Sequence, residues 1–362
     1  MSRSSPRWTP SADPVSPSPF VIPFFIAHQG CPHQCVFCNQ HVITGSSGRL
    51  TAAQVREEIV RWLGWPRDGK RQVQVAFYGG SFTGLARERQ EELLGAVGPF
   101  LEQGEVELIR LSTRPDYVDQ AKARFLKERG VGLVELGIQS FADRVLAQSR
   151  RGHTAQQVSE AFAHLRQEGI AVGGQLMVGL PGETTAGLIA GARRLVALKP
   201  DLVRIYPTLV LKASPLADLL AAGRYRPLSM NRAIALCARL KEIFDEAAIP
   251  VVRLGLQPSA SLEHDLLAGP YHPAFGELVL SRLYFRRLRK RLTVLQKERG
   301  CATIRLILAP ADRSLFAGQQ RCAARRLAAL GLLDHVEVAF PPGQPRATIN
   351  HEIIHGYSQS HC

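Results

Sequence analysis

Three cysteines lie close together near the start of the chain. Cys31, Cys35 and Cys38 have CxxxCxxC spacing and follow the apolar run 21–27, which predicts a strand. Three thiolates can ligate three irons of a 4Fe–4S cluster and leave the fourth iron open to a small molecule. A structural zinc site with a histidine as its fourth ligand is the other chemistry that these thiols support. The histidines close enough in sequence are His28, His33 and His41.

The remaining cysteines do not extend this cluster. They are scattered along the chain, at Cys237, Cys301, Cys322 and Cys362. This distribution does not suit the disulfide framework of a small secreted domain, and it favours a metal or redox site in a reducing compartment. The chain also has no apolar region typical of a signal peptide and no run approaching the roughly 18 apolar residues of a membrane span. We therefore expect a cytoplasmic protein that does not enter a membrane.

Strand-like and helix-like segments alternate through the middle of the chain. The strand-like runs are 21–27, 73–78, 106–111, 131–138, 170–178 and 202–205, and the helix-like stretches are 51–63, 87–101, 118–128, 154–168 and 184–198. This alternation predicts a parallel sheet. A doubly wound sheet fits the pattern too, but unusual residues follow strand after strand, as they do at the carboxyl ends of barrel strands. We predict an α/β fold with a partial (β/α)6 TIM-like barrel.

The domain organisation follows from changes in composition. Residues 1–19 are rich in Ser and Pro and predict a disordered leader. Residues 20–255 form the predicted barrel, and residues 256–362 a basic C-terminal extension. The extension is expected to contain a helix of about two dozen residues with apolar positions at helical spacing. A small strand–helix–strand unit should follow, at 302–308, 318–330 and 335–340.

Glycine or polar motifs occur at or after the predicted strands. Two bare glycines follow the second strand, where they would let backbone groups approach a ligand closely. A plain strand-to-helix turn would also explain them. The residues singled out in these motifs are Gly79, Gly80, Ser81, Ser112, Gln139, Arg151 and Gln175.

Together with the cysteine loop, these motifs resemble the radical S-adenosylmethionine (radical SAM) superfamily, and specifically the radical SAM half of the catalytic subunit of Elongator and its bacterial relatives. The resemblance covers residues 20–255. It implies a 4Fe–4S cluster, S-adenosylmethionine (SAM) and an electron donor such as flavodoxin or ferredoxin. It also implies an enzyme that cleaves SAM reductively to a 5′-deoxyadenosyl radical and modifies a tRNA base similar to the wobble uridine.

The resemblance also implies which residues hold the cofactors. The three clustered cysteines would ligate the iron, Phe37 would lie near the adenine, and the glycine motif would bind the amino group of SAM. Gln139 and Arg151 would contact the ribose and the carboxylate, since the guanidinium fork can bond both carboxylate oxygens. For Arg151, charge on a helix surface is the alternative reading. Ser112 and Gln175 stand where many relatives carry Glu and Asp, so they can bond SAM hydroxyls without adding negative charge.

The resemblance leaves out the acetyltransferase half of the Elongator subunit. We expect no acetyltransferase activity, because only a short strand–helix–strand unit follows the long helix and no glycine-rich phosphate-binding signature occurs there. Two other functions stay open at this point. One is a small-molecule radical enzyme similar to oxygen-independent coproporphyrinogen oxidase. The other is a non-catalytic iron–sulfur or zinc protein that binds nucleic acid.

Positive charge is concentrated near the C-terminus. The net charge is +14, and residues 281–330 hold thirteen Lys and Arg against two acidic residues. A solvated helix face explains the run 286–291, but the excess continues beyond it with few acids to balance it. Contacts with the phosphate backbone of tRNA are the functional alternative.

Two other segments invite functional interpretations. His351-Glu-Ile-Ile-His355 matches the HExxH pattern of zinc proteases, which requires a helix, but Ile353 and Ile354 favour a strand as much as a helix. We expect a chance match. Tyr271, His272 and Glu277, in and just after a Gly/Pro loop, could line the barrel mouth or simply lie at the surface.

Overall fold

The computed structural model describes residues 19–26, 31, 34–39, 50–66, 71–300 and 302–354. The predicted leader lies outside this part of the chain except for Pro19, and so do Cys301 and Cys362. The chain forms two compact units. Unit 1 comprises residues 1–233 and 243–271, and unit 2 comprises residues 234–242 and 272–362. The sequence-based domain division at 255 and 256 stays a prediction.

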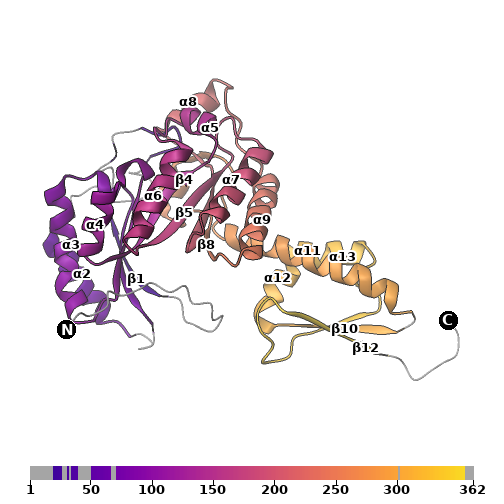
Figure 1. Cartoon of the computed structure of the whole chain (residues 1–362). Helices are drawn as coiled ribbons and strands as arrows, with labels where there is room; N and C mark the ends of the chain where they lie inside the picture. The colour runs from indigo at the N-terminus through magenta and orange to yellow at the C-terminus, as the bar shows by residue number, and fades with distance from the viewer. Residues whose placement is uncertain are drawn as a thin grey trace. The chain divides into compact units, whose positions relative to one another are not determined.

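Unit 1 is built on a sheet of seven parallel strands in the order β1-β2-β3-β4-β5-β6-β8 (Figure 1). The strands are β1 (Phe20–Phe25), β2 (Val73–Tyr78), β3 (Leu108–Thr113), β4 (Val131–Gln139), β5 (Ala171–Val178), β6 (Leu202–Pro207) and β8 (Val251–Leu254). Neighbours in this order follow one another along the chain, which is the arrangement of a partial barrel. The predicted fold class is therefore confirmed. The sheet has one strand more than expected, β8. This strand was not predicted because it is only four residues long and half of its residues are polar or exposed.

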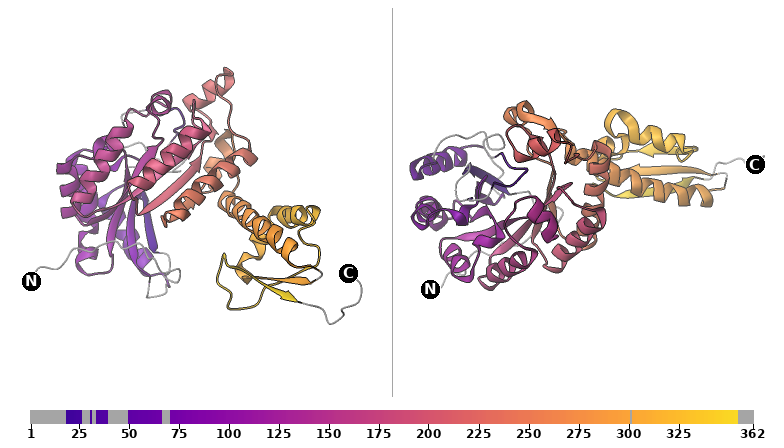
Figure 2. Two further views of the ribbon diagram at one scale, coloured as in Figure 1. Left: turned by 45° about the vertical axis from the view of Figure 1, so that its right-hand side comes forward. Right: turned by 90° about the horizontal axis from the view of Figure 1, so that it is seen from above.

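The five predicted helices all form, with ends within two residues of the expected ones, and they lie on the outer face of the curved sheet (Figure 2). They are α2 (Ala52–Leu63), α3 (Arg87–Glu102), α4 (Gln120–Glu128), α6 (Ala155–Gln167) and α7 (Thr185–Ala197). Side chains define where two of them begin. Thr51 and Gln54 form a reciprocal capping box at the start of α2, and Thr154 and Gln157 do the same for α6.

Other short elements connect these units. They are α5 (Asp143–Gln148), α8 (Pro215–Ala221), α9 (Met230–Glu246), α10 (Ala260–Asp265) and the antiparallel pair β7 (Val210–Leu211) and β9 (Leu266–Ala268). The segment 266–268, which directly precedes the Gly/Pro loop, is therefore a strand. Tyr271 donates a hydrogen bond to Glu263 at 2.6 Å, so its hydroxyl has a partner within unit 1.

The sheet has an apolar layer near the amino ends of its central strands. Leu108, Leu133, Ala171 and Leu202 pack together there. Two residues further along these strands, Arg110, Glu135 and Arg204 form a charged layer. It lies on the same face as the apolar layer, because alternate residues of a strand share a face. Gly173 leaves the space that this change needs, since a Cβ on it would lie 2.6 Å from Leu202 Cδ1 and 3.2 Å from Glu135 Cγ.

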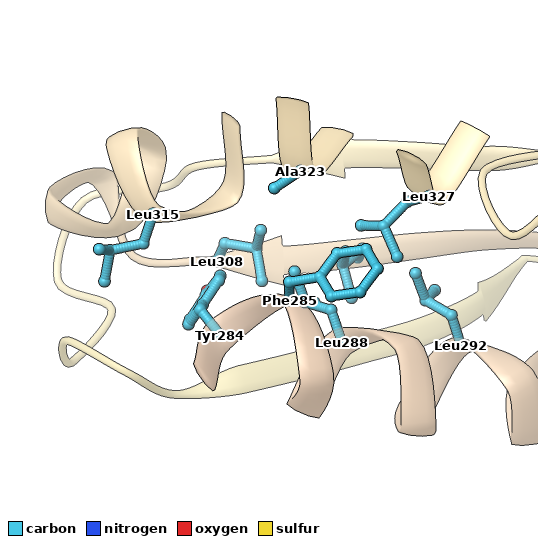
Figure 3. Packing of buried hydrophobic residues seen from close by; sticks show 9 residues of the cluster. Tyr284, Phe285, Leu288, Leu292, Leu308, Leu315, Ala323 and Leu327 are labelled. Atoms are coloured by element: carbon cyan, nitrogen blue, oxygen red, sulfur yellow. The ribbon is translucent and has the colours of Figure 1, made fainter. Parts of the chain in front are cut away.

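Unit 2 packs a long helix against a small sheet. The helix is α11 (Phe275–Glu298), and the sheet has the order β11-β10-β12. Its strands are β10 (Thr303–Leu308), β11 (Val336–Ala339) and β12 (Ile349–Ile354), and the helices α12 (Arg313–Ala317) and α13 (Cys322–Ala329) connect β10 to β11. Phe285, Leu288 and Leu292 of α11 point into a core that α12, α13 and β10 complete (Figure 3).

Strand β12 contains the first four residues of the HExxH match, 351–354, so the protease interpretation, which needs a helix here, is wrong for this segment. β12 pairs antiparallel with β10, and His351 lies opposite Leu306. Successive side chains of a strand point to opposite faces, so this segment does not present the motif as one helical turn. His351 instead contacts Arg291, whose Nη2 lies 3.2 Å from Nδ1. His355 lies outside the described residues.

Within the part of the chain that the structure describes, the helices are too short or too polar to span a bilayer.

Candidate functional site

The cysteine loop is held between two parts of unit 1. Val36 N donates to Ser149 O at 3.1 Å, and Leu216 N of α8 donates to Val36 O at 2.8 Å. Cys38 N donates to Cys35 O at 3.0 Å, which closes a tight turn, and Cys35 is buried. These backbone bonds fix the middle of the loop beside the segment that leads to Arg151.

Among the described residues, no three His, Cys, Asp or Glu side chains lie close enough together to hold a metal ion. This includes the three cysteines of the loop. A metal commonly draws its ligands together as it binds, so the chemistry of the donors decides whether they fit. Three cysteines on an anchored loop suit an iron–sulfur cluster. The histidines that would complete a zinc site, His28, His33 and His41, lie outside the described residues.

Arg151 connects this loop to the barrel. Its Nη1 donates to Cys35 Sγ at 3.5 Å, and its Nη2 donates to Gly137 O in β4 at 2.7 Å. The side chain is 7% exposed, yet its Nε has no hydrogen-bond partner among the described atoms. An unpartnered buried N–H of this kind fits a ligand carboxylate. Gly137 provides the space, since a Cβ there would lie 2.7 Å from Arg151 Nη2. Arg151 is therefore not a surface charge.

Gln139 lies next to Arg151 in a strained backbone conformation. Its φ is +66°, the β4–β5 register shifts beside it, and Ser140 N donates to Ile138 O at 2.8 Å across it. Residues other than Gly rarely hold such angles, and they concentrate at functional sites. Gln175 Nε2 donates to Gln139 Oε1 at 3.0 Å. The structure thus brings together Gln139, Arg151 and Gln175, which the sequence placed in three separate motifs.

The other predicted cofactor contacts lie at the carboxyl ends of β2 and β3 and in the cysteine loop. Gly79 has a φ of +92°, a left-handed conformation that favours glycine. Ser81 is buried, with its hydroxyl 3.0 Å from Thr113 Oγ1, so its side chain holds β2 to β3. Ser112 is half-buried near the end of β3. Phe37 packs with Val36 and is half-buried.

A charged network fills the barrel interior below these residues. Glu135, 4% exposed, accepts hydrogen bonds from Arg110 Nη2 at 2.6 Å and Arg204 Nη2 at 3.2 Å. Arg110 Nη1 also donates to Gln74 Oε1 at 3.1 Å, and Arg204 Nη2 to Tyr78 Oη at 3.0 Å. Burial, followed by the charge of Glu135, raises the pKa of Tyr78 to about 12. This network was not predicted from the sequence, although Arg110, Glu135 and Arg204 stand out there as charged residues inside otherwise apolar strands.

Comparisons with known proteins match this architecture. The radical SAM superfamily matches residues 25–190, and the radical SAM C-terminal domain family matches residues 200–285. An uncharacterized protein of Methanocaldococcus jannaschii is 30% identical over 228 residues, which are 60% of this chain and 69% of that protein. The chain belongs to the radical SAM superfamily. Enzymes of this superfamily use a 4Fe–4S cluster and SAM, so the two predicted cofactors are confirmed at the level of the family.

The resemblance to Elongator-like proteins is also confirmed. A tRNA uridine(34) acetyltransferase of M. jannaschii is 25% identical over 62% of this chain and 48% of its own length. Elongator complex protein 3 of Saccharomyces cerevisiae is 28% identical over 52% of this chain and 37% of its own. The chain thus spans about half or less of these two relatives. The fold of the archaeal Elp3 of Methanocaldococcus infernus is similar, with a TM-score of 0.57 at 21% identity over 75% of this chain and 63% of that one.

Side chains at the glycine motif should block the activity of this radical SAM protein. We expect Gly79→Val, which must place a β-branched residue at a φ of +92°, to lower SAM cleavage by on the order of a hundredfold, since small displacements of a bound reactant have effects of this size. Gly80→Val should act similarly, because a side chain on the second glycine of the motif would displace the amino group of SAM. Deoxyadenosine formation measures the effect. Gly98→Ala is the control, because no atom beyond its chain neighbours and the backbone of its own helix lies within 4 Å of the added Cβ. Full activity in Gly80→Val would show that the motif is misplaced.

Acid should destabilise unit 1 through His153. Its Nε2 lies 3.2 Å from Ile138 O, so Nε2 carries the proton and donates it. Burial, followed by the positive charge of Arg151, lowers the pKa of His153 from 6.5 to about 3. Folding therefore favours the neutral ring, and the free energy of unfolding should fall as the pH drops from 6.5 towards 3. The expected loss is about 2 kcal/mol at pH 5.

Urea unfolding at pH 7 and pH 5 measures this loss. A His153→Gln variant has no titrating ring, so its free energy of unfolding should change about 2 kcal/mol less between these two pH values than that of the unaltered protein. The same change in both proteins would show that His153 is not the group responsible.

Proposed function

We propose that this chain is a SAM-cleaving radical enzyme that acts on a base of tRNA, and that Cys31, Cys35 and Cys38 hold its 4Fe–4S cluster. When bound and reduced, the cluster supplies the electron that cleaves SAM and releases a 5′-deoxyadenosyl radical. The observation that carries this proposal is Arg151, a buried guanidinium that donates to Cys35 Sγ and keeps one N–H unpartnered.

The roles of the other residues follow from where they lie around Arg151. The Nε of Arg151 would donate to the SAM carboxylate, which would satisfy its buried N–H. Gln139 and Ser112, at or near the carboxyl ends of their strands, and Gln175, which donates to Gln139 from the middle of β5, would hydrogen-bond the hydroxyls of SAM. The backbone at Gly79 and Gly80 would receive the amino group, and Phe37 would pack near the adenine.

The substrate class is supported by the relatives and by charge. One relative is named as an acetyltransferase of tRNA uridine 34, and another is named as a protein of the Elongator complex. In this chain the exposed side of α11 carries a run of basic residues that fits a polyanion. The run consists of Arg286, Arg287, Arg289, Lys290 and Arg291. We therefore propose a tRNA uridine, similar to the wobble uridine, as the base modified.

Two further points complete the proposal. The electron would come from a small redox protein such as a flavodoxin or a ferredoxin, because the reduction of SAM needs an external donor. Acetyl transfer, which the relatives' name states, is not part of the proposal, because this chain spans 48% of the length of that relative from M. jannaschii.

Nucleoside mass spectrometry of tRNA from a deletion strain tests the substrate. We expect one modified uridine to disappear, to return when the intact gene is supplied, and to stay absent when a Cys35→Ala copy is supplied. The last comparison separates loss of chemistry from loss of the protein. An unchanged set of tRNA nucleosides in the deletion strain would refute a tRNA substrate and direct attention to small molecules.

A further inference from the structure

A pocket in unit 2 is walled mainly by arginine side chains. Its volume is about 300 Å³, and five of its seven lining residues are arginines. They are Arg239 of α9, Arg282, Arg286 and Arg289 of α11, and Arg326 of α13. The other two lining residues are Ala235 and Phe285. The pocket therefore combines a high density of positive charge with a small apolar surface.

The fold holds these arginines close together. Arg282, Arg286 and Arg289 are spaced by four and three residues, so they share one face of α11. Like charges at this spacing repel one another. Arg326 comes from α13, with its guanidinium carbon 5.3 Å from the centroid of the Phe285 ring. Because Phe285 and Leu327 belong to the same buried cluster, the packing of unit 2 fixes α13 against α11 (Figure 3).

One carboxylate compensates part of this charge. Glu242 pairs with Arg286 at 3.0 Å and with Arg239 at 3.3 Å. No carboxylate of the described residues lies within ion-pair distance of Arg282, Arg289 or Arg326. Burial, followed by the charges of Arg326, Arg286 and Arg289, lowers the pKa of Arg282. Three guanidinium groups thus face the pocket with their repulsion uncompensated.

We propose that this pocket binds a phosphate of the RNA backbone, with Arg282, Arg289 and Arg326 as its ligands. A guanidinium fork donates two parallel N–H groups to phosphate oxygens, and three of them around one pocket match a phosphodiester with its neighbouring sugar. This inference rests on the proposed function for its ligand, tRNA. It goes further by assigning the contact to one pocket rather than to the whole basic run.

The salt dependence of tRNA binding separates the two possibilities. A pocket variant carries Arg282→Gln, Arg289→Gln and Arg326→Gln. A matched variant carries Arg287→Gln, Lys290→Gln and Arg291→Gln. It also removes three positive charges, all of them on α11 and outside the pocket. Fluorescence anisotropy with bulk tRNA at several salt concentrations gives the log–log slope. We expect the pocket variant to lower the slope by roughly 0.7–0.9, which is the contribution of the one phosphate contact that the pocket holds, and the matched variant to leave the slope nearly unchanged.

Each outcome has a definite meaning. Equal slopes for the two variants, or a larger loss in the matched variant, would overturn the pocket and leave tRNA binding in place. Failure of the unaltered protein to bind tRNA would overturn both the pocket and the tRNA substrate, while SAM cleavage would still report on the radical chemistry. Thermal unfolding excludes a folding defect, because removal of like charges should leave the midpoint of the pocket variant unchanged or higher.

Discussion

Replacement of Cys31, Cys35 or Cys38 by Ala is expected to abolish iron binding. Protein purified without oxygen should hold about four irons per chain and be brown, as a 4Fe–4S protein is. Each variant should lose the colour and the iron, because the remaining two thiolates of the loop cannot hold a cluster that needs three. Iron and sulfide analysis with the absorption spectrum measures the effect. No SAM cleavage should remain in any of the three variants.

The control for this result is an exposed cysteine outside the loop. Cys322 begins α13 in unit 2, so Cys322→Ala should keep full iron content. Stoichiometric zinc without iron in the unaltered protein would contradict the cluster and favour the structural zinc site. Loss of only part of the iron in a single loop variant would mean that the three cysteines are not its only ligands.

Removal of the carboxylate in the barrel interior is expected to destabilise unit 1 strongly. Glu135→Leu would leave Arg110 and Arg204 without their anion. The loss of one partner from a buried ion pair commonly costs about 3–5 kcal/mol. Urea unfolding of the anaerobically purified protein measures the difference.

Glu337→Leu is the matched control, because Glu337 pairs with Arg305 at 3.4 Å where both side chains are exposed. An exposed pair is worth less than about 1 kcal/mol, so this variant should unfold near the midpoint of the unaltered protein. Similar losses in the two variants would show that Glu135 contributes no more than a surface carboxylate does.

Local patterns were sufficient to predict most of the fold. The run 73–78 was predicted as a strand and forms β2 with the same bounds. The capping residues Thr51 and Thr154 mark where two of the predicted helices begin. Strand β12 was missed because it forms by pairing with β10, which lies about 45 residues earlier, and has no buried apolar run of its own. The missed strand β8 has the same explanation.

The candidate site depends even more strongly on contacts between residues that are far apart in the sequence. Motifs pointed to Gln139, Arg151 and Gln175 one by one, but no local signal predicted that Arg151 would reach Cys35, 116 residues away. The positive φ of Gln139 depends on the bulge between β4 and β5, and the arginines on both sides of Glu135 come from β3 and β6. Contacts between strands decide these features, and a linear pattern does not contain them.

Anaerobic reaction of the reconstituted protein with SAM and dithionite tests the central claim most directly. The account predicts that 5′-deoxyadenosine and methionine form without any added substrate, and that Arg151→Ala forms little of either because it lacks the proposed carboxylate contact. An iron-loaded protein that binds SAM but forms no deoxyadenosine, with or without tRNA, would contradict the account.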